Sequence, residues 1–166
     1  MYQIGETIVY GQTGVCTVEA IGYLPETGKK RLYYTLRPRY MPGMVYVPVE
    51  APVYSRPLLS PTQARDWIAR MPEIPEHICP DGRLMAQRQF YSGVFHSHDM
   101  ALMIGVIKGL YHKEHSKTRN GRPLSVTERQ VFRQAEDLVH QELAASLGVE
   151  VEQIPQYIRN RLQMSG

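Results

Sequence analysis

Residues 4–21, IGETIVYGQTGVCTVEAI, decide the fold of the first third of the chain. On both sides of its centre the stretch is rich in β-branched and aromatic residues, which favour strands: Ile8, Tyr10, Val15, Thr17 and Val18. Gly11 and Gly14 bracket a short connection where we expect a positive φ, because glycine adopts it without strain. The stretch therefore predicts two β-strands joined by a glycine-containing turn.

Two further hairpins are predicted after this one. The turn cluster PETGKK at residues 25–30 and the cluster PRYMPG at residues 38–43 each have strand-like residues on both sides. Four or five short strands in fewer than sixty residues predict a small, strongly bent β-barrel over residues 1–57. A module of this size buries little apolar surface, so we expect it to depend on a neighbour or a partner.

Residues 44–48, MVYVP, have the alternating pattern of a strand, with Val45 and Val47 on either side of Tyr46, and end at a proline. Proline cannot donate to a strand ladder and favours sheet edges. An edge strand can accept a strand from another protein. The plainer alternative is that this segment is only the last strand of the barrel, blunted against aggregation, and the pattern alone favours that alternative.

The remainder, residues 58–166, has the signals of helices. Ser60 to Gln63 and Ser125 to Glu128 have the sequence of capping boxes, which start helices. Between them, prolines at positions 72, 75 and 80 predict a linker without helix. After the linker, we expect Asp81 to cap a helix that runs to about Phe95 and carries one stripe of residues: Leu84, Gln87, Arg88 and Tyr91.

Residues 99–115 are apolar on most sides, which predicts the central helix of a bundle. Gly148 is expected to end the long helix that begins after Ser125, and a last helix is expected over 154–162. Five helices with short connections predict a compact antiparallel bundle. The expected fold class is therefore α+β, with a small β-barrel followed by a compact bundle of about five helices.

Composition narrows the class of protein. The chain has 166 residues and a net charge of +3, too small a surplus to establish nucleic-acid binding. Cys16 and Cys79 have no partner motif, so a disulfide framework and a zinc ribbon are both disfavoured. The chain opens directly on a strand pattern, which predicts no signal peptide. No apolar run approaches the ~20 residues of a membrane helix, and we expect a soluble cytoplasmic protein.

An enzymatic function is disfavoured by the same inspection. Four histidines lie close in sequence (His96, His98, His112 and His115), and the last two share a helix face at spacing i, i+3. No carboxylate or cysteine stands nearby in a recognisable ligand pattern. No Ser-His-Asp, Cys-His or paired-carboxylate arrangement is evident. We therefore expect no catalytic activity, no cofactor and no metal.

In order and spacing, the motifs resemble those of the CarD-type transcription regulators. The resemblance rests on residues 4–10 and 14–21, on 33–36 followed by 45–48, and on 106–111, 124–128 and 135–144. The same β module occurs as the polymerase-interacting domain of the transcription-repair coupling factor. The coupling factor itself is excluded because the chain has no phosphate-binding loop of the Walker type.

The resemblance implies a Tudor-like, SH3-like barrel that adds its edge strand to the β-subunit lobe of RNA polymerase. It implies that the helical domain, residues 58–166, lies against promoter DNA at the upstream edge of the melted −10 region. There an apolar wedge in the minor groove would favour the open state. The implied localisation is cytoplasmic, on the nucleoid through polymerase. A monomer is expected, although the sequence does not fix the oligomeric state.

Family contacts to polymerase fall on the last barrel strand and the nearby second hairpin. They correspond here to Leu24, Val45, Tyr46, Val47 and Pro48. Many family members have arginine at the positions of Leu24 and Tyr46. Main-chain pairing would survive this difference, whereas the charged contacts would not.

Two groups of residues are candidates for the DNA contacts. Arg83, Leu84, Met85 and Arg88 lie around the position of the family's wedge, and Lys113, Lys117, Arg119 and Arg122 form the densest positive patch of the chain. The family's wedge is commonly a tryptophan, and none lies between Ile78 and Phe90. Leu84, Met85 or Ile78 could replace it. Trp67 lies on the apolar stripe of an earlier helix and is expected to be a core residue. The alternative is an adaptor that binds polymerase or another protein without a DNA wedge, its basic residues being only solvated.

Overall fold

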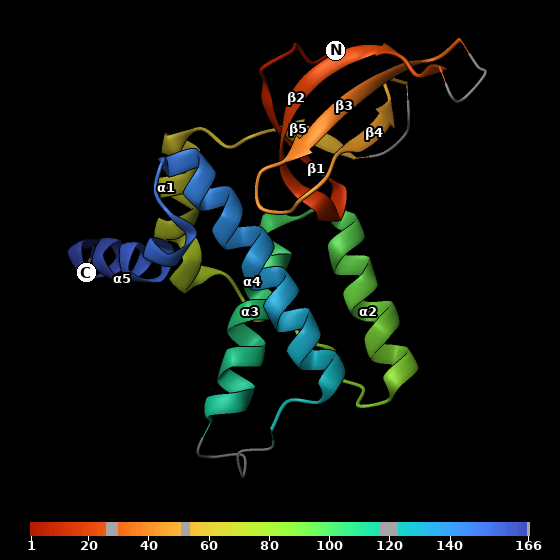
Figure 1. Cartoon of the computed structure of the whole chain (residues 1–166). Coiled ribbons are helices and arrows are strands. Elements are labelled where there is room, and N and C mark those ends of the chain that lie inside the picture. Colours follow the sequence, from red (N-terminus) through yellow and green to blue (C-terminus); the bar gives the residue numbers. More distant parts are fainter. Residues whose placement is uncertain (26–29, 51–53, 117–122, 166) are drawn as a thin grey trace. The chain divides into compact units, whose positions relative to one another are not determined.

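The computed structural model describes residues 1–25, 30–50, 54–116 and 123–165, with side chains up to residue 163. The chain divides into two compact units, Met1–Leu59 and Ser60–Gly166. The first contains the strands and the second the helices (Figure 1). Within the described residues, no helix combines the length and the apolar character needed to cross a membrane.

The first unit is one antiparallel sheet of five strands. They are β1 (Thr7–Tyr10), β2 (Gly14–Tyr23), β3 (Leu32–Pro38), β4 (Val45–Pro48) and β5 (Ser55–Pro57), in the spatial order β4-β3-β2-β1-β5. The predicted first hairpin is confirmed: β1 pairs with β2 across a short 3-10 turn, η1 (Gly11–Thr13). Gly11 and Gly14 have φ values of 47° and 86°, as expected.

The sheet is open, so the predicted closed barrel is not confirmed. Closure would require β4 to pair with β5, and no such pairing occurs in the described part of the unit. Both strands are short and end at prolines, Pro48 and Pro57, which cannot donate to a ladder. The sheet is nevertheless bent, with a register shift in β2 between Val18 and Ala20. The sequence predicts β4 as the last strand of the unit, whereas β5 follows it at the opposite edge of the sheet.

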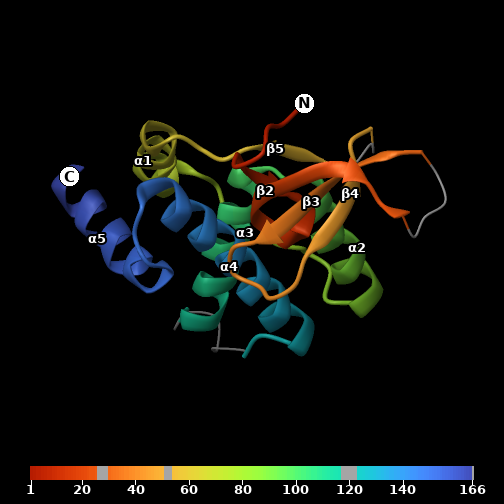
Figure 2. The same ribbon diagram turned by 45° about the horizontal axis from the view of Figure 1, so that its top comes forward.

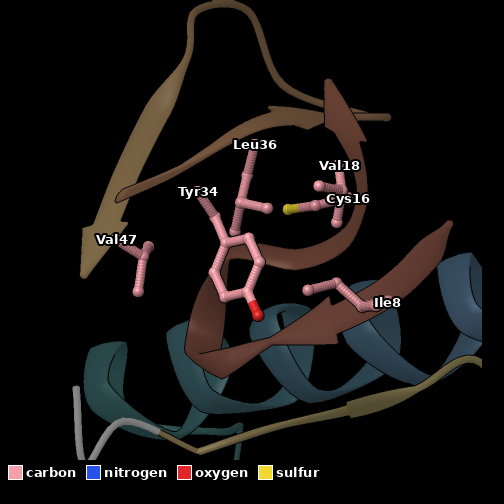
Figure 3. Close-up of a cluster of buried hydrophobic side chains, with 6 residues drawn as sticks. All are labelled: Ile8, Cys16, Val18, Tyr34, Leu36 and Val47. Atoms are coloured by element: carbon pink, nitrogen blue, oxygen red, sulfur yellow. The ribbon is translucent and has the colours of Figure 1, made fainter. Parts of the chain in front are cut away.

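The core of this unit lies on the inner face of the bent sheet (Figure 3). Six side chains from four strands form it: Ile8, Cys16, Val18, Tyr34, Leu36 and Val47. Tyr34 and Leu36 alternate along β3, as a strand with one buried face requires. Burial raises the pKa of the Cys16 thiol to about 11, so this cysteine behaves as an apolar core group.

Over its described residues, the second unit contains five α-helices and two short 3-10 turns, and Figures 1 and 2 show the helices from two directions. The helices are α1 (Pro61–Arg70), α2 (Leu84–Ser97), α3 (Met100–His115), α4 (Val126–Leu147) and α5 (Ile154–Ser165), and the turns are η3 (Met71–Glu73) and η5 (Val151–Gln153). Both predicted capping boxes are confirmed, at the starts of α1 and α4. Gly148 ends α4 in the left-handed conformation, with φ of 69°.

The central helix is α4, not α3 as we expected from its apolar sequence. Helix α4 packs against α1, α2, α3 and α5. Helix α3 is apolar on several sides because it is covered twice, by α4 and by the proline-containing linker. A Cβ at Gly105 would lie 2.7 Å from the carbonyl oxygen of Pro75, and one at Gly109 would overlap Ile78. The two glycines therefore let the linker lie directly on the helix.

The predicted start of α2 was wrong. Asp81 does not cap the helix, because its carboxylate accepts hydrogen bonds from the backbone and side chain of Arg83. The helix begins at Leu84 with Arg83 as its N-cap residue. The predicted stripe is divided in the structure: Gln87 and Tyr91 are buried, while Leu84 and Arg88 are exposed.

Candidate interaction surfaces

Strand β4 lies at one edge of the sheet, and its register shows which backbone groups point outward. It pairs with β3 so that Tyr34 faces Val47 and Thr35 faces Tyr46. The amide of Val49 donates to the carbonyl of Leu32 at 3.0 Å. Since hydrogen-bonded and non-hydrogen-bonded pairs alternate in an antiparallel ladder, Val45 and Val47 bond to β3 and Tyr46 and Pro48 point their backbone groups away from it.

Proline has no amide hydrogen, so this edge is uneven. Pro48 offers only its carbonyl, whereas Tyr46 offers both an N–H and a C=O in the outward direction. Within β4, Tyr46 is therefore the one residue able to exchange two backbone hydrogen bonds with an added strand. Val45 and Pro48 are half-buried.

The side chains of β4 also alternate. Val47 is buried in the core, while Tyr46 is 53% exposed on the opposite face. Leu24 is half-buried just after the end of β2 and before residues 26–29, which lie outside the described structure. The predicted polymerase-binding residues thus form one continuous edge strand plus one residue near a hairpin end.

The start of α2 exposes apolar side chains beside arginines. Leu84 is 50% exposed and Met85 is 74% exposed. Arg83 precedes them, and Arg88 follows one helical turn later on an exposed position. This arrangement combines an apolar protrusion with cations able to contact phosphates. It contains four of the predicted DNA-binding residues.

Arg83 is already engaged in the structure. Its guanidinium donates to Asp81 at 2.6 Å, and that contact holds the pKa of the aspartate below its ordinary value. The ion pair is exposed at the arginine, so it is weak and can exchange with a phosphate. Arg88 is the simpler candidate for a phosphate contact.

The second predicted DNA-binding group is only partly described. Lys117, Arg119 and Arg122 lie outside the described residues. Lys113 lies at the end of α3 and donates to Glu128 at 2.5 Å. Its side chain is 35% exposed, while that of Glu128 is only 5% exposed. Lys113 thus compensates a buried carboxylate as well as contributing positive charge at this end of α3.

Trp67 was expected in the core, and that prediction was wrong. It is half-buried on α1, and the guanidinium of Arg70 stacks on its ring at 4.1 Å from the centroid. The buried face of α1 is instead formed by Ala64 and Ile68.

The histidines that are clustered in the sequence contact different partners in the structure. His112 contacts Glu76 at 3.1 Å, a carboxylate from the linker that sequence proximity did not reveal. His115 bonds to the Tyr111 carbonyl and stacks on the Tyr111 ring. Over the described part of the chain, no group of three or more side chains is arranged to hold a metal ion.

One feature of the β unit was missed altogether by sequence reasoning. A cavity of about 230 Å³ lies between β4 and β5, with walls from Tyr2, Tyr10 and Tyr34. Tyr2 and Tyr10 are distant in sequence from Tyr34, and they meet it only in the folded unit. Tyrosine alone is a weak signal for such a wall, because the chain has 11 tyrosines.

The comparison with known families bears on this same unit. An edge strand on a small bent sheet suits a protein-interaction domain, because it can pair with a strand of a partner. Residues 2–53 match the family model of the CarD-like/TRCF RID domain. The N-terminal unit therefore belongs to this RNA polymerase-interacting domain family, and the resemblance inferred from its motifs is confirmed. No curated protein matches the chain.

At the level of the family, this domain interacts with RNA polymerase and is not catalytic by itself. The match ends within the first unit, and the helical unit lies outside it.

Proposed function

We propose that this protein is a transcription regulator that binds the β-subunit lobe of RNA polymerase through β4 and contacts promoter DNA through its helical unit. By holding the upstream edge of the melted −10 region, it stabilises the open complex. The observation that carries the first part is the outward N–H and C=O of Tyr46 on an edge strand of a polymerase-interacting domain.

The proposed DNA contact is supported by the start of α2. A wedge is favourable where the duplex is already distorted, and exposed leucine and methionine side chains suit that role. Leu84 and Met85 supply them, and Arg83 and Arg88 supply flanking positive charge. A protein that binds only the distorted duplex shifts the population toward the open state.

A second candidate function is an adaptor that binds polymerase without engaging DNA. It is favoured by the position of the single tryptophan, which stacks on Arg70 in α1 and not at the start of α2. It is also favoured by the ion pair between Arg83 and Asp81. A mobility shift on forked promoter DNA separates the two functions, because phosphate contacts make DNA binding depend steeply on salt.

Polymerase binding is tested with two substitutions at one position in the full chain. Tyr46→Pro removes the outward amide without removing a bond to β3, whereas Tyr46→Ala removes only the side chain. Calorimetric titration with the isolated β-subunit lobe should show binding lost in Tyr46→Pro and changed only a few-fold in Tyr46→Ala. Wild-type affinity in Tyr46→Pro would refute docking through this edge.

A further inference from the structure

We infer that the cavity between β4 and β5 receives one apolar side chain of the strand that docks on β4. This inference rests on the proposed function, since it concerns how the same edge selects its partner. The occupant is a branched aliphatic or aromatic side chain from that polymerase strand. The cavity would then act as a specificity pocket beside an edge that otherwise offers only backbone hydrogen bonds.

The pocket is built from both edges of the open sheet. Val47, Pro48 and Val49 line it from the β4 side and Ser55 lines it from β5. Its inner wall is core, formed by Ile8 and Leu36. Figure 3 shows the Tyr34 ring lying between Val47 and Ile8. The pocket thus combines an apolar inner wall with the hydroxyl groups of Tyr2, Tyr34 and Ser55.

Hydrogen bonds fix the polar groups at this pocket. The Tyr2 hydroxyl donates to Ser55 Oγ at 3.1 Å, and the Tyr2 amide donates to the Tyr34 hydroxyl at 3.0 Å. The rings of Tyr2 and Tyr34 are tilted with centroids 5.8 Å apart. Because the side chains of Tyr2, Tyr34 and Ser55 each have a hydrogen-bond partner within the pocket wall, an apolar occupant would not leave these three unpaired.

The pleat of β4 aims an added strand at this pocket. Side chains on neighbouring strands that lie side by side point to the same face. Val47 points to the inner face and Tyr46 to the outer one. A residue of the added strand beside Val47 therefore directs its side chain inward, toward the cavity, and the residues on either side of it do not.

The volume suits a single side chain. A cavity of about 150 Å³ with apolar walls holds a benzene molecule. At about 230 Å³, the pocket has room for one leucine-sized or aromatic group and too little for two aromatic rings. Burying such a group would strengthen binding beyond what the backbone hydrogen bonds provide, and the experiment measures this gain in affinity.

The test fills the pocket in the full-length protein. Ser55→Phe places a ring in the cavity, and Ala20→Phe adds similar bulk at an exposed position of β2 that does not line it. In titrations with the β-subunit lobe, Ser55→Phe should bind about tenfold more weakly and Ala20→Phe like wild type. If Ser55→Phe binds like wild type while Tyr46→Pro does not bind, the pocket is refuted and edge docking stands. If Tyr46→Pro also binds, the proposed docking fails.

A measurement on the wild-type protein covers the case in which Ser55→Phe fails to fold. Methyl resonances of Ile8, which lines the pocket, should shift when the lobe binds. Those of Ile68, buried on α1, should not. If the Ile8 methyl resonances stay unchanged when the protein is saturated with the β-subunit lobe, the inference is overturned.

Discussion

Lys113 donates to Glu128 at 2.5 Å and so joins the last turn of α3 to the first turn of α4. Glu128 also completes the capping box of α4, because it receives the Ser125 amide bond at 3.0 Å. The nearly buried Glu128 carboxylate therefore binds the last turn of α3 and also caps the start of α4. Burial raises the pKa of Glu128, but the bonds from Lys113 and Ser125 outweigh it and hold the pKa below its ordinary value.

Lys113→Met should destabilise the helical unit by about 2–4 kcal/mol, because it leaves a buried carboxylate without its cation. Adding Glu128→Gln should recover part of the loss, since glutamine removes the charge and still suits a capping box. Urea unfolding followed by the fluorescence of Trp67, which lies in this unit, measures both effects. Equal stability of Lys113→Met and wild type would show that the ion pair contributes nothing.

The same carboxylate predicts a pH dependence. Because its pKa is lower folded than unfolded, its stabilising contribution is present above the ordinary value of 4.5 and is lost as pH falls through the folded pKa. Wild type should therefore lose more stability between neutral and acidic pH than Glu128→Gln. Thermal unfolding of the two proteins across that range provides the comparison, and parallel pH profiles would contradict it.

Two glycines, Gly105 in α3 and Gly93 in α2, predict opposite signs for the same substitution. Gly105→Ala should destabilise, because the added Cβ would lie 2.7 Å from the Pro75 carbonyl and displace the linker backbone. Gly93→Ala is the matched control, with nothing within 4 Å of its Cβ in α2. It should stabilise by about 0.5–1 kcal/mol through helix propensity. Stabilisation by both substitutions would show that the linker is not tightly packed on α3.

Lys108 fixes the other end of that linker. Its ammonium group donates to the carbonyls of Met71 at 2.8 Å, Pro72 at 3.2 Å and Ile74 at 2.5 Å. Lys108→Met keeps the aliphatic stem and should cost about 1.5–3 kcal/mol, as expected for hydrogen bonds to a charged group. Chemical denaturation of this variant beside Lys30→Met, an exposed lysine of the β unit, checks the value. If Lys108→Met loses no more stability than Lys30→Met, the hydrogen bonds of Lys108 to the linker carbonyls do not stabilise the fold.

Local signals in the sequence predicted the elements well, and the reason is visible in particular residues. Ser60, Ser125 and Gly148 act within one helical turn of their own positions, so their roles follow from the chain alone. Gly11 and Gly14 likewise set a turn between adjacent strands. Such features need no knowledge of distant partners.

Long-range contacts were not predictable in this way. Asp81 could have capped α2, but Arg83 holds its carboxylate. Helix α3 has the composition of a central helix, but its apolar surface faces a linker that lies on Gly105 and Gly109. The cavity beside β4 depends on Tyr2, Tyr34 and Ser55 meeting in space. In each case a pairing between separated residues decided the outcome.

The division of labour between the two units leads to the last prediction. Arg88→Glu on the exposed face of α2 should weaken stabilisation of the promoter complex and leave binding to the polymerase lobe intact. The physical reason is the loss of a phosphate contact, which also lowers the salt dependence of DNA binding by about one in the logarithmic slope. Arg159→Glu makes the same charge change at an exposed position of α5 and serves as the control. Open-complex lifetimes and lobe titrations should then diverge for Arg88→Glu alone, whereas an equal loss of both activities would refute separate surfaces for polymerase and DNA.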